Sequence, residues 1–220
     1  MKPANTCVCG CFSHIISGIR PQLAMGIIYL VLTGCLYIIS LPIQAVIAVV
    51  ILCGTGMPVF FAQQRVGKSG KRFIMYKFRT MVNGADQLQK QHQGHNESKG
   101  PVFKIHNDPR FTGIGKFLSH TGLDELPQLI NVLRGEMSLI GPRPLPLLEA
   151  KKLKPWMRAR ERVLPGIISP AILTGSYHTD FEAWMRHDVA YVKEKNPIGD
   201  IGLFLQSIPF MFRLFLRCVR

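Results

Sequence analysis

Residues 123–144 read LDELPQLINVLRGEMSLIGPRP and decide the fold around them. The apolar residues with helical spacing are Leu126, Leu129, Ile130 and Leu133. Gly135 follows as a helix stop. Because proline is tolerated only in the first turn of a helix, Pro127 places the start of this helix near Leu123 or Asp124.

Two adjacent carboxylates, Asp124 and Glu125, open this predicted helix. Acids are common at helix starts, where they cap free N–H groups and favour the positive end of the helix dipole. That ordinary role explains the pair when it is considered alone. The motifs around the pair favour a chemical role instead.

Three basic residues accompany the acid pair in these motifs. Residues 141–144 are Gly-Pro-Arg-Pro, a rigid turn that presents the guanidinium of Arg143. Upstream, Lys77 and Arg79 lie at the edge of a predicted strand. Carboxylates and several cations are the groups that phosphoryl transfer needs, namely a nucleophile or metal ligand and clamps on phosphate oxygens.

A long apolar segment precedes these motifs. Residues 23–53 read LAMGIIYLVLTGCLYIISLPIQAVIAVVILC, and no charged residue occurs between positions 21 and 64. About 20 apolar residues suffice to span a bilayer. Pro42 lies near the middle and predicts a break close to Leu41. We expect a re-entrant hairpin over 23–54; a tilted single span with a proline kink is the alternative.

The remaining chain predicts a small domain with few strands. Residues 58–81 predict two short strands around a turn at 67–70, and residues 151–162 predict a basic helix. Residues 201–220 predict an amphipathic helix lying in the membrane interface, with core packing as the alternative. The expected fold is a membrane-associated, mostly helical α+β protein. Its parts are an N-terminal flank at 1–22, a membrane helix at 23–54, a catalytic domain at 58–200 and an interfacial helix at 201–220.

Composition indicates an anionic partner. The 220 residues include 27 Lys and Arg against 13 Asp and Glu, a formal net charge of +14. Nucleic acid, anionic lipid and phosphorylated substrates are all partners that could bind a protein with this excess of positive charge. Cys7, Cys9 and Cys11 have spacing that suits a soft metal, but no further His or Cys set completes a zinc site. Free thiols are the simpler interpretation.

The stretch RVGKSGKRFIMYKFRTM, followed by DPRFTGIGKFLSHTGLDELPQLINVLRGEMSLIGPRP, resembles the bacterial sugar transferase family. These are monotopic phosphoglycosyl transferases that begin the assembly of membrane-bound glycans such as exopolysaccharide, capsule, O-antigen and glycoprotein glycans. The likeness covers roughly residues 58–200 and the proline-containing anchor. The larger family members have an additional N-terminal membrane domain that is not seen in this sequence, so the chain resembles the minimal form of the family.

The resemblance implies a role for each matching residue. Asp124 matches the nucleophile that attacks a UDP-sugar, releases UMP and passes the sugar phosphate to polyprenyl (undecaprenyl) phosphate. Glu125 matches the second acid, for which general acid/base work and positioning are both open. Magnesium is the expected cofactor, bound beside Asp124. Arg143 matches a phosphate-binding arginine, and Lys77 and Arg79 match basic residues that contact the donor.

The resemblance also implies a location. Pro42 matches the family's helix-breaking proline, which places the chain in the bacterial inner membrane with its catalytic domain on the cytoplasmic face. Membrane lipids are expected partners and nucleic acid is not. A homodimer stays open.

Some positions depart from the family pattern. Ser119 and His120 stand where relatives often carry arginine, and Lys116 or His120 is a candidate substitute. Leu41, not serine, precedes Pro42. Residues 168–170 replace the usual Thr-Gly pattern after Pro165 and Gly166.

Two other classes remain as alternatives. A basic membrane-anchored binding module explains the charge but not the acid pair beside residues 141–144, and it lacks the interleaved aromatic and basic residues of single-strand binders. A catalytically inactive family member is disfavoured by the intact Asp124, Glu125 and Arg143.

Overall fold

The computed structural model describes residues 21–97, 100–103, 105, 107–174 and 180–219. Its α-helices are α2 (Pro21–Thr55), α3 (Ala85–Gln91), α4 (Gly113–Thr121), α5 (Leu129–Leu133), α6 (Leu147–Ala150), α7 (Pro170–Leu173), α8 (Phe181–Glu194) and α9 (Pro197–Val219). Its 3-10 helices are η1 (Lys68–Gly70), η2 (Gln93–His95), η3 (Leu123–Gln128) and η4 (Pro155–Arg162). Its strands are β1 (Phe60–Val66), β2 (Arg72–Phe78), β3 (Ser138–Ile140), β4 (Leu145–Pro146) and β5 (Gly166–Ile168). The predicted mostly helical α+β class is confirmed. The cysteines at positions 7, 9 and 11 lie outside the described residues.

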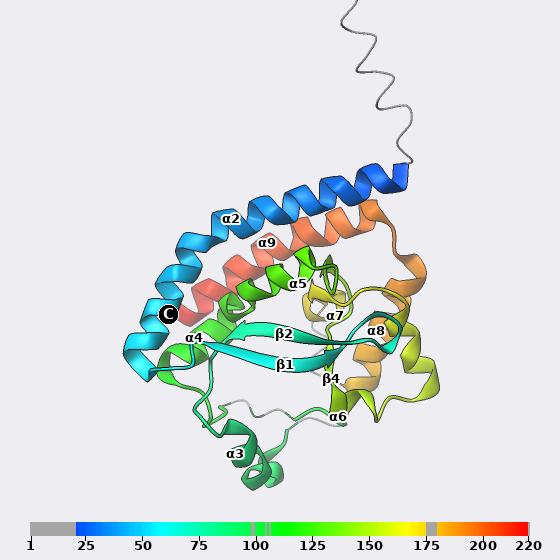
Figure 1. Ribbon diagram of the computed structural model, residues 1–220. Coiled ribbons are helices and arrows are strands. Elements are labelled where there is room, and N and C mark those ends of the chain that lie inside the picture. The colour runs from blue at the N-terminus through cyan, green and yellow to red at the C-terminus, as the bar shows by residue number, and fades with distance from the viewer. Residues whose placement is uncertain (1–20, 98–99, 104, 106, 175–179, 220) are drawn as a thin grey trace, which may run out of the picture.

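Helix α2 is long, apolar and curved. It runs for 35 residues with Pro42 inside it, and Figure 1 shows it following a bent path along the edge of the molecule. In place of the predicted break, the helix continues through the proline. Polar side chains support this region, because Ser40 Oγ donates to the carbonyl of Tyr37 and Gln44 Nε2 donates to Ser40 Oγ.

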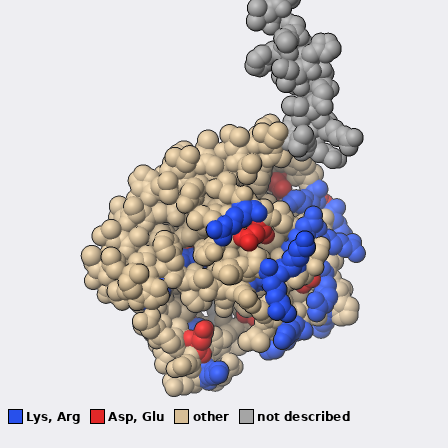
Figure 2. Space-filling model, in the orientation of Figure 1, with Lys and Arg blue, Asp and Glu red and all other residues tan. Residues whose placement is uncertain are grey.

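Most of the apolar surface of α2 is not covered by protein. Val46 and Val49, for example, are 64% and 58% exposed, and Figure 2 shows a broad surface without charged side chains over this helix. Ile47 and Ile51 are buried in a cluster with Val59 and other residues of the domain. Within the part of the chain that the structure describes, two helices are long and apolar enough to cross a membrane, one over Gly26–Thr55 and one over Pro197–Cys218.

The small sheet matches the predicted pair of strands and adds a third. β1 and β2 are antiparallel, with Phe60 opposite Phe78 and Val66 opposite Arg72. β4 pairs with the other edge of β1, and β3 pairs in parallel with β5. Residues 141–144 therefore connect one sheet to the other, since β3 ends at Ile140 and β4 begins at Leu145.

The prediction of one basic helix over residues 151–162 is wrong. α6 ends at Ala150, and a separate 3-10 helix, η4, begins at Pro155. The residue before proline is pushed out of the helical region, and Lys154 is accordingly extended, with φ −65° and ψ 156°. The C-terminal helix also starts earlier than expected, at Pro197 instead of 201.

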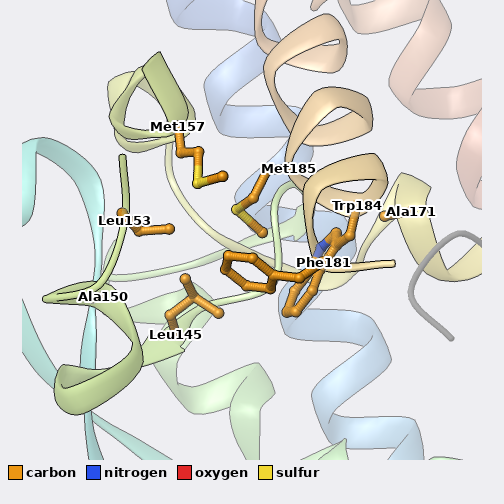
Figure 3. Packing of buried hydrophobic residues seen from close by; sticks show 8 residues of the cluster. All are labelled: Leu145, Ala150, Leu153, Met157, Ala171, Phe181, Trp184 and Met185. Carbon is orange, nitrogen blue, oxygen red and sulfur yellow. The ribbon is translucent and has the colours of Figure 1, made fainter. Parts of the chain in front are cut away.

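A compact apolar cluster supports this half of the domain (Figure 3). Phe181, Trp184 and Met185 of α8 pack against residues from the β4, α6, η4 and α7 segments. The members are Leu145, Ala150, Leu153, Met157, Ala171, Phe181, Trp184 and Met185. The cluster fixes η4 and α8 relative to the start of β4, next to residues 141–144.

Arg79 joins the end of α2 to strand β2. Its Nη2 donates to the carbonyls of Thr55 and Gly56 at 2.9 and 2.6 Å, and its Nη1 donates to the carbonyl of Met57 at 2.8 Å. The last carbonyls of a helix lack partners within it. Arg79 is only 7% exposed, so it satisfies these groups where little water can reach them.

Replacing Arg79 by Met should therefore lower the free energy of unfolding by roughly 1–3 kcal/mol, because buried carbonyls lose their donors. Thermal unfolding in detergent micelles measures the effect. Arg72→Met, at an exposed position that begins β2, is the matched control and should leave the midpoint unchanged. Equal midpoints for the two variants would contradict the structural role of Arg79.

Candidate active site

Asp124 lies on η3, directly after a sharp turn. Gly122 ends α4 with φ 73°, a left-handed conformation that favours glycine. The helix starts at Leu123 as predicted, but its first six residues are a 3-10 helix and the α-helix proper begins only at Leu129. This geometry packs η3 against β2 and leaves Asp124 only 4% exposed.

The structure brings together four of the five predicted polar site residues. Lys77 Nζ lies 3.5 Å from Asp124 Oδ2 and 2.8 Å from Glu125 Oε1. Arg143 Nη1 lies 2.9 Å from the same Glu125 oxygen. The side chains of Lys77, Glu125 and Arg143 are 15%, 15% and 22% exposed. A phosphate group reaching this site would meet two cations beside one nearly buried carboxylate.

The turn that presents Arg143 is held at three consecutive carbonyls. Gly166 N donates to the carbonyl of Pro142 at 3.0 Å. Arg160 Nη2 donates to the carbonyl of Arg143 at 2.5 Å, and Arg65 Nη1 donates to the carbonyl of Pro144 at 3.0 Å.

Close approach of backbone to backbone adds to this fixation. A Cβ placed on Gly166 would lie 2.1 Å from the Gly141 nitrogen, so only glycine fits there. The turn is therefore a rigid support for one guanidinium.

Burial and the neighbouring charges act differently on the two acids. Burial raises the pKa of Asp124 above its ordinary value, and Lys77 partly opposes that rise. Burial also disfavours the charge of Glu125, but Arg143 and Lys77 outweigh it and lower the pKa of Glu125 to about 2. Glu125 is thus a permanent anion at neutral pH. Lys77 and Arg143 favour the charged form of Asp124, and burial and Glu125 oppose it.

An apolar groove lies beside the acid pair. It has a volume of about 360 Å³ and is lined by Pro42, Ile43, Val46, Ile47, Val50, Ile114, Phe117, Leu118 and Leu123. Its walls come from the second half of α2 and from α4. Leu123 of η3 also lines the groove and immediately precedes Asp124 in sequence. The groove therefore brings the exposed apolar surface of α2 near the element that carries the acid pair.

Comparison with known proteins identifies the family. The sequence model of the bacterial sugar transferases matches residues 22–214. The chain belongs to the bacterial sugar transferase family.

Several curated relatives of this sugar transferase have informative names. It is 37% identical over 198 residues to the galactosyl transferase CpsE of Streptococcus agalactiae, covering 90% of this chain and 42% of the relative. It is 35% identical to the undecaprenyl-phosphate galactose phosphotransferase of Salmonella typhimurium, covering 72% of this chain and 34% of that relative. The exopolysaccharide production protein ExoY of Sinorhizobium fredii is 30% identical, with 81% of both chains covered. The sugar transferase thus spans less than half the length of the first two relatives but most of the third.

Arg79 is the predicted site residue that the structure places elsewhere. Its guanidinium is committed to the end of α2, as described above, although Arg79 is only two residues from Lys77 in sequence. Successive side chains of a strand point to opposite faces, so residues two positions apart share a face. Positions 77 and 79 would therefore share a face only if the strand included both. β2 ends at Phe78, and Arg79 turns toward α2. Its predicted contact with the donor stays a prediction.

The positions that replace the family arginine lie on α4. His120 is exposed, and its Nδ1 lies 2.7 Å from the carbonyl of Lys116. Lys116 Nζ donates to Asn107 Oδ1 at 3.1 Å. Neither side chain is engaged with the acid pair in these contacts.

Asp124 is the member of the acid pair that could hold a magnesium ion. Mg²⁺ is commonly held by one or two carboxylates together with substrate phosphates and water. In the described ranges no group of three or more His, Cys, Asp and Glu could hold a metal. Asp124 can supply one carboxylate oxygen, while Glu125 is occupied by Lys77 and Arg143. The donor set therefore fits an ion that the phosphates of a substrate would help to bind.

Sequence reasoning missed Arg65, Arg160 and Asp188. Arg65 is the first charged residue after the apolar segment, and Arg160 lies in the predicted basic helix, so neither belongs to a motif with acids. Asp188 is fully buried, and its Oδ2 lies 2.7 Å from Arg160 Nη2.

Proposed function

We propose that this sugar transferase moves a sugar-1-phosphate from a UDP-sugar to polyprenyl phosphate, releasing UMP, at the cytoplasmic face of the inner membrane. The single observation that carries the proposal is the contact of Asp124 with Lys77, beside Glu125 and Arg143, on an element whose first residue, Leu123, lines an apolar groove. The names of the relatives, which include an undecaprenyl-phosphate galactose phosphotransferase, support this choice of acceptor. The product would begin a membrane-bound glycan.

In the first half-reaction, a carboxylate oxygen of Asp124 attacks the β-phosphorus of the donor. The bond from that phosphorus to the bridging oxygen breaks, and UMP leaves with the electron pair. A sugar-phosphoryl-aspartate remains. Lys77 and Arg143 stabilise negative charge on the phosphate oxygens, and a carboxylate needs no general base to act as a nucleophile.

In the second half-reaction, a phosphate oxygen of the polyprenyl phosphate attacks the same phosphorus. The bond to Asp124 breaks, and the carboxylate is regenerated. A covalent intermediate allows one small site to serve a soluble donor and then a lipid acceptor. A magnesium ion beside Asp124 would offset the repulsion between the carboxylate and the diphosphate.

Glu125 acts as a positioning residue in this mechanism. Its oxygen Oε1 contacts both Lys77 and Arg143, and its pKa of about 2 makes it a poor proton carrier at neutral pH. It therefore sets the spacing of the two cations. Of the two roles that the resemblance left open, this one has the better physical support.

The groove supports a lipid acceptor. A polyprenyl chain is apolar, and burial of apolar area is favourable by roughly 25 cal/mol per Å². A chain lying between Val46 and Phe117 would direct its phosphate toward Leu123 and Asp124. We place α2 in the bilayer as a bent, re-entrant helix and α9 along its surface. Both placements agree with the exposed apolar side chains of these helices.

Purified protein should release UMP from a UDP-sugar in the presence of magnesium and polyprenyl phosphate, and Asp124→Asn should abolish the release. A panel of UDP-sugars with a luminescent UMP assay makes the measurement. Asp86→Asn, an exposed acid on α3, is the control and should retain full activity. Activity that survives Asp124→Asn would refute the nucleophile, and salt-sensitive nucleic-acid binding without UMP release would favour a binding module.

Lys77→Met should shift the acid limb of the pH–rate profile to higher pH. Burial already raises the pKa of Asp124 and Lys77 lowers it; removing the cation raises it further, so the reactive carboxylate forms only at higher pH. Single-turnover UMP release at saturating donor measures the limb. Lys90→Met on α3 is the control. A limb that stays in place or moves to lower pH would contradict the role of Lys77.

Val46→Trp should weaken use of the lipid acceptor without affecting the first half-reaction, because the indole would fill the groove. Val49→Trp is a matched control on the same helix, since Val49 is similarly exposed and is outside the groove lining. The KM for polyprenyl phosphate should rise about tenfold or more for Val46→Trp alone. This change corresponds to the loss of about 1–2 kcal/mol of apolar contact with the lipid. Equal effects of both variants would place the acceptor elsewhere.

A further inference from the structure

A buried ion pair lies behind the turn of residues 141–144. Asp188 of α8 is 0% exposed and Arg160 of η4 is 5% exposed. Arg160 Nη2 is 2.7 Å from Asp188 Oδ2, and the guanidinium also lies 5.6 Å from the ring centre of Trp184. This pair is separate from the acid pair, and the mechanism above makes no use of it.

Stability alone is a weak explanation for such a pair. Removing two charges from water costs several kcal/mol per ion, and well-packed apolar residues often replace a buried pair without loss of stability. Met157, Trp184 and Met185 lie three or four positions before Arg160 or Asp188 and belong to one apolar cluster (Figure 3). Two apolar side chains could pack there, so stability does not explain why these two positions are charged.

A third contact of Arg160 explains why the pair is charged. The same Nη2 donates to the carbonyl of Arg143 at 2.5 Å. A charged donor makes a shorter and stronger hydrogen bond than a neutral one. Asp188 thus holds Arg160, Arg160 holds the main chain of Arg143, and the side chain of Arg143 holds Glu125 at 2.9 Å. Alternating charges connect α8 to the acid pair.

We propose that Arg160 and Asp188 are positioning residues that fix Arg143 for catalysis, an inference that rests on the proposed function. Prolines on both sides of Arg143 remove two main-chain donors, so the turn depends on outside donors to its carbonyls. Arg160 supplies the one at Arg143 itself. A displacement of about 1 Å in a catalytic group can cost about 100-fold in rate. Loss of the hydrogen bond from Arg160 could therefore slow the reaction by up to about that factor.

A double-mutant cycle tests the proposal. Asp188→Asn, Arg143→Ala and the double variant are compared with the unchanged protein for the single-turnover rate of UMP release at saturating donor. Asp188→Asn should slow the rate about 10- to 100-fold when Arg143 is present. In the Arg143→Ala background it should have little further effect, because the group that it positions is gone. Equal factors in the two backgrounds would overturn the proposal.

Arg160→Lys provides a second, milder variant. It keeps the positive charge, but a single ammonium lacks the planar fork of arginine, so the same loss of rate and the same dependence on Arg143 are expected. Arg158→Gln on η4 and Arg186→Gln on α8, both exposed, are the controls and should act like the unchanged protein. Thermal unfolding reports the folded state of each variant. If neither Asp188→Asn nor Arg160→Lys can be obtained folded, the pair serves the fold and the positioning role is lost.

This design separates the two proposals. If the unchanged protein releases no UMP with any UDP-sugar, the proposed function fails. If it releases UMP and the cycle is additive, only the positioning role fails.

Discussion

The contact between Lys77 and the two carboxylates is the interaction on which the rest of this site depends. One ammonium lies 2.8 Å from Glu125 and 3.5 Å from Asp124. Two adjacent, largely buried acids would otherwise repel each other and tend to hold a proton. The cation of Lys77 and the guanidinium of Arg143 permit both negative charges in one small space. Both cations are also close enough to Asp124 to contact a phosphate group that approaches its carboxylate.

Rigid main chain keeps these charges in place. Lys77 is on a strand paired to β1 over its whole length, and Asp124 and Glu125 follow the left-handed turn at Gly122. Arg143 projects from a turn in which the carbonyls of residues 142, 143 and 144 each accept a hydrogen bond. Arg79, which directly follows β2, binds the carbonyls at and just after the end of α2. The end of α2 is thus held next to the strand that carries Lys77.

The sequence predicted the local features well and the long-range ones poorly. The paired strands, the helix start at Leu123 and the grouping of Lys77, Asp124, Glu125 and Arg143 follow from turn chemistry and short motifs. The division of residues 151–162 was missed because a run of basic residues concealed the effect of Pro155.

The remaining differences depend on tertiary contacts. Pro42 lies inside α2 without ending it, and the hydrogen bonds of Ser40 and Gln44 occur in the same turns of the helix. Arg79 and Arg160 have roles that only the folded chain determines: which carbonyls lie within reach of a guanidinium is not encoded in spacing. Arg160 and Asp188 are 28 residues apart, and no periodicity pairs them.

The most direct test of the account is to locate the covalent intermediate. The protein is incubated with a UDP-sugar and magnesium, quenched in acid and digested, and tandem mass spectrometry then assigns the modified residue. The account predicts one phosphosugar on Asp124, formed without polyprenyl phosphate and lost when it is added. A phosphosugar on Glu125, or lipid-linked product formed with no modified peptide, would contradict it.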